Sequence, residues 1–124
     1  MTVVIDSAFL ADVRSGAPKA IRLLDQLIAD RETAIVPSVV AAEYLTGSRD
    51  PDADLAALEA AAVLLDYRLD DARAASDIAR RALPQGRFPG WMDVMIGGFA
   101  KARGDLRIVT RNARHFSDNP TLGY

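Results

Sequence analysis

The sequence contains no cysteine and only one histidine, His115, among its 124 residues. The lack of cysteine excludes disulfides, thiolate metal sites and cysteine nucleophiles, and a single histidine leaves no histidine-rich set of zinc ligands. No apolar run approaches the roughly 18 residues of a membrane span, and no basic segment precedes an apolar stretch at the N-terminus, so we expect no signal peptide. The protein is therefore expected to be cytoplasmic and without membrane association.

An excess of positive charge is also absent, because 15 basic residues stand against 17 acidic ones and the net charge is −2. This excludes an overall basic field that would attract nucleic acid by phosphate contacts alone. Lys19 and Lys101 are the only lysines, and the other basic residues are arginines. Arginine suits bidentate phosphate contacts, although a GC-rich genome would give the same abundance of alanine and arginine. The 50% hydrophobic content is enough for one core, so residues 1–124 are expected to form a single domain.

Short apolar runs alternate with helical patterns along the chain. The runs that are typical of buried strands are residues 3–5, 34–36 and 106–110, with 63–65 as either a helix tail or a further strand. Helical patterns are expected at residues 18–28, 38–46, 55–62, 70–82 and 92–103. Strands separated by helices predict an α/β fold with right-handed βαβ units. We expect a mostly parallel central sheet of four to five strands, covered by helices on both faces.

Three acidic residues fall where such a sheet would bind a ligand. Asp6 ends the first strand, Asp93 lies in the first turn of a helix, and Glu43 has apolar neighbours on another helix. Open parallel sheets bind ligands at the carboxyl ends of their strands, and closely placed carboxylates resist joint ionisation without a cation. A hard cation such as Mg²⁺ or Mn²⁺ takes oxygen ligands. The pattern therefore favours a metal site built on these three side chains.

Each of these acidic residues also has an ordinary interpretation when it is taken alone. Asp6 can be a cap or turn residue, and Asp93 can stabilise the positive end of a helix dipole. Glu43 can be a solvated residue on an exposed helix face. The metal-site hypothesis rests on the expectation that all three reach one edge of the sheet.

Four segments in this order resemble the PIN-domain ribonucleases, and among them the VapC toxins of type II toxin–antitoxin systems. The segments are DSAFL after the first strand, PSVVAAEYLTG at 37–47, WMDVMIGGFA at 91–100 and IVTRNARHF at 108–116. The resemblance implies a three-layer PIN-like fold and Mg²⁺- or Mn²⁺-dependent hydrolysis of RNA phosphodiester bonds. It also implies a cognate VapB-like antitoxin protein, whose C-terminal segment lies in the toxin groove, and a homodimer.

The resemblance further implies roles for single residues. Asp6 and Asp93 match metal ligands of the family, and Glu43 matches the acid that completes the site directly or through water. Thr110 and Asn112 match polar positions after the last strand. The implied chemistry is hydrolysis assisted by a metal that activates a water and polarises the phosphate, with Glu43 positioning or deprotonating that water or binding a second cation.

Three arginines are candidates for RNA binding because of their places in the sequence. Arg111 and Arg114 follow the last strand beside the site, and Arg87 lies in an opposite loop. Their guanidinium groups suit the phosphate backbone, although each can equally be a solvated surface residue.

The sequence departs from the family pattern at two positions. Ala8 stands where many relatives carry a polar residue, which removes one hydrogen bond from the expected site. His115 stands where many carry the fourth acid, so a second metal site is less strongly indicated. Asn112 and Asp118 are the other candidates near that variable position, and His115 can equally be a loop residue packed beside Phe116.

Two other classes of protein remain open at this point. A catalytically degenerate PIN-like binding module is compatible with Ala8 and His115. A phosphoaspartyl-type phosphatase or receiver is compatible with Asp6 after a first parallel strand, but the phosphatase would need a second aspartate where Ala8 stands. A serine hydrolase is disfavoured, because no Gly-x-Ser-x-Gly elbow is present.

Overall fold

The computed structural model describes all of residues 1–124. One five-stranded parallel sheet has the order β3-β2-β1-β4-β5. The strands are β1 (Thr2–Ile5), β2 (Thr33–Pro37), β3 (Val63–Leu65), β4 (Arg107–Thr110) and β5 (Thr121–Gly123). This confirms the parallel sheet predicted from the sequence and resolves 63–65 as an edge strand.

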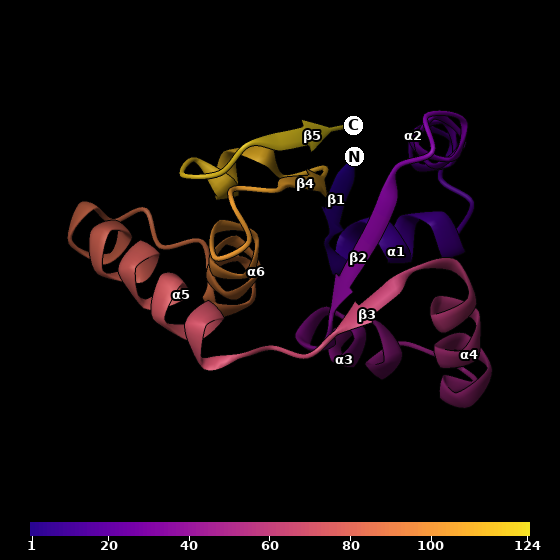
Figure 1. Ribbon diagram of the computed structural model, residues 1–124, viewed down its shortest axis with the longest axis horizontal. Helices are drawn as coiled ribbons and strands as arrows, with labels where there is room; N and C mark the ends of the chain where they lie inside the picture. Colours follow the sequence, from indigo (N-terminus) through magenta and orange to yellow (C-terminus); the bar gives the residue numbers. More distant parts are fainter.

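Six helices cover the two faces of the sheet and give the expected three layers (Figure 1). They are α1 (Ser7–Arg14), α2 (Pro18–Ala29), α3 (Ser38–Thr46), α4 (Pro51–Ala61), α5 (Leu69–Ala82) and α6 (Trp91–Lys101), with short 3₁₀ turns η1 (Leu83–Gln85) and η2 (Ala113–Phe116). Helices α1 to α4 follow β1 and β2 on one face, while α5 and α6 follow β3 and pack together on the other. None of these helices has the length and apolar character needed to cross a lipid bilayer.

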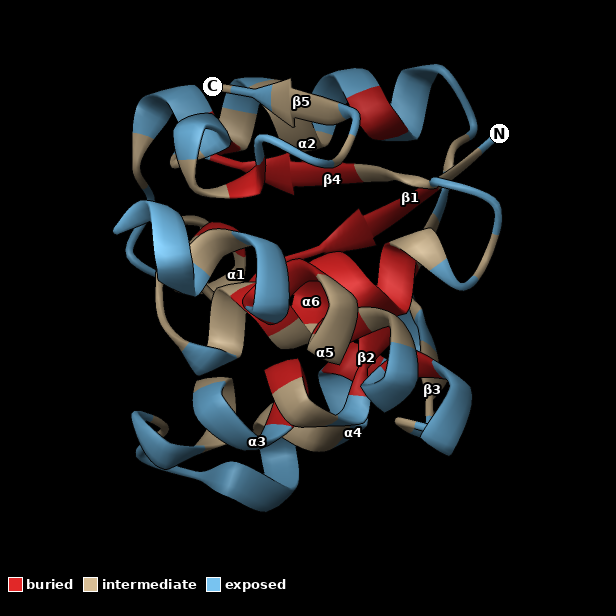
Figure 2. Ribbon diagram, turned by 90° about the vertical axis from the view of Figure 1, so that its left-hand side faces the viewer, coloured by how far each residue is buried: buried red, intermediate tan, exposed pale blue.

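The centre of the core lies between β1, β4 and α6, and many residues of these three elements are buried (Figure 2). Val3, Val4 and Ile108 are fully buried, as expected for β-branched runs in a parallel sheet covered on both faces. On the helix side, Ile96 and Phe99 of α6 are equally buried. Strands β1 and β4 end at the candidate site and α6 begins there, so a packed core holds the side chains of the site.

The sheet has a topological switch point between β1 and β4. The chain passes from β1 to β2 on one side, whereas β4 pairs with the other side of β1, with Ile5 opposite Val109. The carboxyl ends of β1 and β4 are therefore neighbours, and Asp6 and Thr110 lie at this edge. Crevices of this kind are where open α/β sheets bind their ligands.

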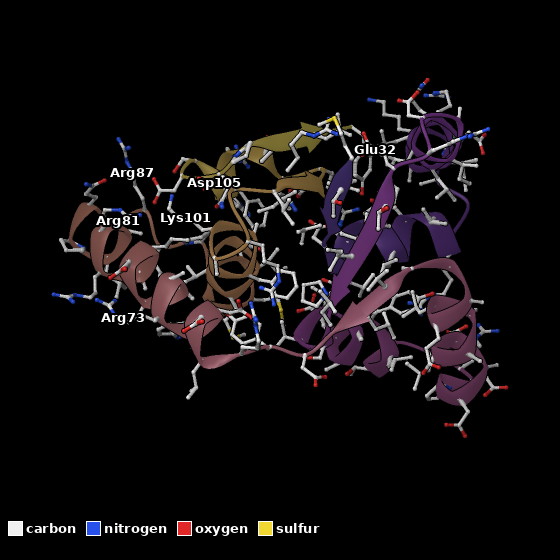
Figure 3. All side chains as sticks on the ribbon, viewed as in Figure 1. Glu32, Arg73, Arg81, Arg87, Lys101 and Asp105 are labelled. Atoms are coloured by element: carbon white, nitrogen blue, oxygen red, sulfur yellow. The ribbon has the colours of Figure 1, made fainter.

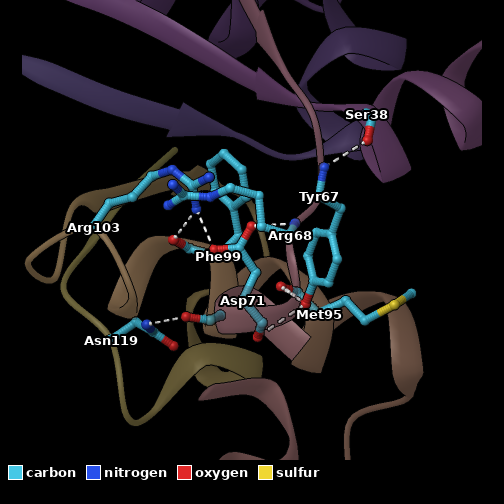
Figure 4. A network of polar contacts seen from close by, with 9 residues as sticks. Ser38, Tyr67, Arg68, Asp71, Met95, Phe99, Arg103 and Asn119 are labelled. Atoms are coloured by element: carbon cyan, nitrogen blue, oxygen red, sulfur yellow. Dashed lines mark hydrogen bonds and ion pairs between the residues drawn. The ribbon is translucent and has the colours of Figure 1, made fainter. Parts of the chain in front are cut away.

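Helices α5 and α6 cross closely because Gly98 has no side chain. A Cβ atom at this position would lie 2.4 Å from the backbone nitrogen of Ala75. An ion pair also connects α5 to the turn that follows α6, since Arg103 Nη1 lies 2.5 Å from the Oδ1 of Asp71, whose side chain is completely buried (Figure 4). The Tyr67 hydroxyl donates to the carbonyl of Met95 at 2.9 Å in the same region. These contacts fix the position of α6 and hence of its first turn.

The structure differs from the sequence prediction at three places in its helices, and strand β5 was not located from the sequence. Helix α1 follows Asp6 directly and was not predicted, although Asp6 is its N-cap. Helix α4 begins at Pro51, before the expected residue 55, because Asp50 caps it. Ile28 was placed in the apolar stripe of α2, but it is 66% exposed.

Candidate functional site

Asp6 lies at the end of β1 with its carboxylate almost completely buried. Its Oδ1 accepts a hydrogen bond of 2.8 Å from the backbone N–H of Phe9, which closes the first turn of α1. Burial raises the pKa of Asp6, while the hydrogen bonds from Thr110 and Phe9 lower it and the charge of Asp93 raises it again. The local sequence thus makes Asp6 both a helix cap and a buried acid that faces a second acid.

Thr110, at the end of β4, connects Asn112 to this carboxylate. Hydrogen bonding by the Thr110 side chain lowers the pKa of Asp6, and the Thr110 hydroxyl oxygen accepts the backbone N–H of Asn112 at 3.0 Å. Both expected polar residues are therefore at the site. Asn112 reaches Asp6 through its backbone and Thr110, whereas its side chain makes no hydrogen bond.

Asp93 enters the site from the first turn of α6. Its Oδ2 lies 2.8 Å from Nδ1 of His115 in η2. Burial raises the pKa of Asp93, whereas the hydrogen bond and the charge of His115 lower it and the charge of Glu43 raises it. Asp93 therefore interacts electrostatically with both of the other predicted acids.

Glu43 lies on the exposed side of α3 and accepts a hydrogen bond from the hydroxyl of Ser7. Sequence reasoning did not single out Ser7. Its position directly after Asp6, at the start of α1, was the available signal. The contact joins α3 to α1 beside the switch point.

The three predicted acids share one edge of the sheet but do not form a closed cluster. No group of three or more histidine or acidic side chains is arranged to hold a metal ion. The pair of Asp6 and Asp93 nevertheless fits a hard cation, because both are oxygen donors, both are largely withdrawn from water, and the charge of Asp93 raises the pKa of Asp6. A bound cation would relieve that repulsion, with Glu43 as a neighbour of the pair.

Two hollows flank the carboxylates. The larger, of about 480 Å³, has Asp93, His115, Arg87 and Arg114 in its lining. The smaller, of about 260 Å³, lies between α1 and α3 and has Glu43, Ser7, Ala8 and Arg111 in its lining. The predicted RNA-binding arginines are thus divided between the two sides of the site.

Arg111 differs from the other two arginines because it already has a partner. Its Nη1 lies 2.7 Å from Oδ1 of Asp12, and the other oxygen of Asp12 accepts the hydroxyl of Tyr124 at 2.6 Å. Arg111 also lowers the pKa of Asp6 through its charge. It therefore contributes positive potential to the site from a fixed position.

Residues 3–121 match the family model of the PIN domain. The chain belongs to the PIN-domain family. The resemblance found in the sequence is thereby confirmed at the level of the family. The assignment also argues against the phosphoaspartyl alternative, for which Ala8 already lacks the second aspartate.

Several solved structures contain chains with a similar fold, among them chains of VapBC complexes. The chain resembles one in a structure of VapBC2 from Rickettsia felis bound to a promoter DNA fragment, with 16% identity, a TM-score of 0.81 and coverage of 100% of this chain and 99% of that one. A chain of DNA-bound VapBC from Salmonella typhimurium has 22% identity, a TM-score of 0.77 and coverage of 99% and 98%. No curated protein matches the sequence. At these identities the likeness establishes the fold of this PIN domain.

Proposed function

We propose that this PIN domain is a divalent-metal-dependent endoribonuclease and the toxin component of a VapBC-type toxin–antitoxin pair. The observation that carries the proposal is the pair of buried or half-buried carboxylates, Asp6 and Asp93, at the switch point of a PIN fold. The ion would be Mg²⁺ or Mn²⁺, held by Asp6 and Asp93 with Glu43 nearby. When bound, it supplies Lewis-acid polarisation of the scissile phosphate.

Residues of the chain would orient the metal-binding carboxylate and activate the attacking water. Thr110 and the N–H of Phe9 orient the Asp6 carboxylate, and Asn112 orients Thr110. Glu43, the most exposed of the three acids, positions the attacking water and accepts its proton. In the structure the Ser7 hydroxyl donates a hydrogen bond to the Glu43 carboxylate, and this hydrogen bond must break before Glu43 can accept a proton from the water.

Positive charge on both sides of the carboxylates would hold the RNA backbone. Arg87 and Arg114 face the larger hollow, and Arg111 faces the smaller one. Because the chain has a net charge of −2, this local arginine rim and the bound ion must supply the attraction that the protein as a whole lacks.

The partners of the protein follow from the same proposal. Neighbours in structure are chains of VapBC assemblies and of a toxin–antitoxin complex from Klebsiella pneumoniae. This supports a VapB-like antitoxin as the inhibitor of this chain, in addition to the RNA substrate. We also expect a homodimer and a cytoplasmic location.

The test is cleavage of structured RNA by purified wild type, Asp93→Asn and Asp25→Asn, each with Mg²⁺, Mn²⁺ or EDTA. Asp25 lies exposed on α2 and is a control for the loss of one charge. We expect EDTA or Asp93→Asn to reduce the rate by about a hundredfold or more, because a metal contributes several kcal/mol to such reactions. Asp25→Asn should cleave like the wild type, and equal rates in Asp93→Asn would refute the proposal.

A binding module without catalysis is the second candidate function. It is favoured by the contacts that engage Asp93 with His115 and Glu43 with Ser7, together with the lack of a closed metal cluster. In that case the wild type would cleave no RNA with either metal but would still bind an antitoxin-like protein.

A further inference from the structure

The larger hollow lies directly beside Asp93 and has the size of a small-molecule site. Its walls come from the end of α5, the η1 turn, the start of α6 and the segment from η2 to Asn119. Its volume of about 480 Å³ falls within the range of roughly 300–1,000 Å³ that is typical of ligand pockets. A phosphate group alone would leave most of this space unfilled, so the hollow suits a larger ligand.

The free positive charge of the hollow belongs to two arginines. Arg87 and Arg114 are exposed and form no ion pair or side-chain hydrogen bond. Arg81, also in the lining, is paired with Asp118 at 3.1 Å, and Lys101 donates to the backbone carbonyl of Asp118. Figure 3 shows Arg81, Arg87 and Lys101 at the end of the molecule where α5 terminates. Two guanidinium groups are therefore available for a ligand.

Uncharged polar groups occupy the other walls. Gln85 forms no side-chain hydrogen bond, so its amide can both donate and accept. Asn119 donates to the carbonyl of Gly97 at 3.0 Å, which leaves its own side-chain oxygen free to accept. Ile78 and Phe116, both buried, supply apolar surface beneath them. Such a combination can contact the edge and the face of a nucleobase.

We propose that this hollow is a subsite for one unpaired nucleotide of the RNA, adjacent to the phosphate that lies at Asp93. Arg87 and Arg114 contact its phosphate or stack on its base, and Gln85 and Asn119 contact the base edge. The inference rests on the proposed function and adds that the substrate is single-stranded at this point. Sequence-specific recognition of RNA uses unstacked bases in this way, whereas a base inside a helix is not available.

A nucleotide fits the charges of the hollow better than an acidic peptide does. The lining contains Asp93 and Asp118 beside its arginines. A nucleotide brings one negative charge together with a neutral sugar and base, while an acidic segment brings a charge on nearly every residue. Two free guanidinium groups can balance the single charge of a nucleotide, whereas the aspartates would repel the many charges of an acidic peptide.

The test is the binding of a fluorescein-labelled single-stranded RNA of mixed sequence, about ten nucleotides long, in EDTA so that no cleavage occurs. Fluorescence anisotropy would compare wild type, the double variant Arg87→Ala/Arg114→Ala and the control Arg80→Ala. Arg80 is exposed on the same end of α5 but is not in the lining. Melting curves would verify that all three proteins are equally folded.

We expect the double variant to bind at least about tenfold more weakly than wild type, because each charge-assisted hydrogen bond is worth that much or more. If both arginines contact phosphates, the slope of log affinity against log salt should fall by about 1.4. Arg80→Ala should bind like the wild type. A blunt duplex of the same sequence should bind wild type at least about tenfold more weakly than the single strand and should not distinguish the double variant.

Two results would overturn the subsite. One is equal binding of single-stranded RNA by the double variant and Arg80→Ala, and the other is equal binding of duplex and single strand by the wild type. A polyglutamate peptide that binds wild type while single-stranded RNA does not would also overturn it in favour of a protein ligand. A parallel cleavage assay with Mn²⁺ separates the two proposals, because a wild type that cleaves RNA retains its proposed function even if the subsite is absent.

Discussion

The imidazole of His115 in η2 contacts the carboxylate of Asp93 in the first turn of α6, with His115 Nδ1 2.8 Å from Asp93 Oδ2. The imidazole lowers the pKa of Asp93, against the effect of burial. Hydrogen-bond partners of this kind orient metal-ligating carboxylates, which is the role that we propose for Asp93. The residue that departs from the family pattern therefore supports Asp93.

Replacing His115 by alanine should weaken binding of Mn²⁺ by about tenfold, as is typical when an outer partner of a metal ligand is removed. The reason is that the pKa of Asp93 would rise further and its carboxylate would lose its fixed orientation. His115→Gln, which can still donate a hydrogen bond, should recover part of the affinity. Calorimetric titration of the three proteins would measure this, and tighter binding by His115→Ala would mean that the imidazole competes with the ion.

Asp93→Asn should be more stable than wild type in EDTA at neutral pH. The pKa of Asp93 is raised above its ordinary value of 3.8, so folding favours the protonated form and the ionised form destabilises the native state. The stability that protonated Asp93 contributes to the native state is fully present below its ordinary pKa. It is lost as the pH rises through the raised pKa of the folded protein. Urea titrations should show a gap between the two proteins at pH 7 that closes toward pH 4, and a constant gap would contradict the assignment.

Gly98→Ala should destabilise the protein by about 3 kcal/mol, the upper part of the usual range for overpacking. The new methyl group would meet backbone atoms of Ala75, which cannot move without separating α5 from α6. Gly123→Ala is the control, because its Cβ would make only ordinary contacts, the nearest at 3.7 Å. Equal urea midpoints for the two variants would show that the helix crossing is not tight.

Arg103→Met should cost about 3 kcal/mol or more, because it leaves the buried carboxylate of Asp71 without its cationic partner. The exposed pair of Arg73 and Asp77 on α5 provides a contrast. Arg73→Ala should change the free energy of unfolding by less than about 0.5 kcal/mol. If both variants lost a similar amount of unfolding free energy, the pair of Arg103 and Asp71 would be no more stabilising than an exposed ion pair, and the prediction would be wrong.

Much of the fold follows from local sequence patterns. Runs such as 3–5 and 106–110 predict buried parallel strands because β-branched residues fill both faces of a covered sheet. Strand β5 was outside the specific prediction, since three residues between Pro120 and the C-terminus carry no periodic signal. Ile28 is an error of the other kind, because its helical spacing predicts burial in the apolar stripe of α2 but its side chain is exposed.

The sequence predicts where the residues of the proposed site lie in the fold, but it does not predict their contacts. The strand-end positions of Asp6 and Thr110 identify the switch point, because parallel strands bring their carboxyl ends together. The contact of Ser7 with Glu43 depends on how α1 packs against α3, which no local pattern encodes. The larger hollow likewise depends on the approach of Gln85 and Asn119 from segments far apart in the sequence.

The most direct measurement is a calorimetric titration of Mn²⁺ into the metal-free wild type, Asp6→Asn, Asp93→Asn and the control Asp25→Asn, without RNA. If Asp6 and Asp93 hold the ion, the wild type and Asp25→Asn will bind it, and both site variants will lose most of the affinity. Wild-type protein that binds no Mn²⁺, or site variants that bind it like the wild type, would contradict the account.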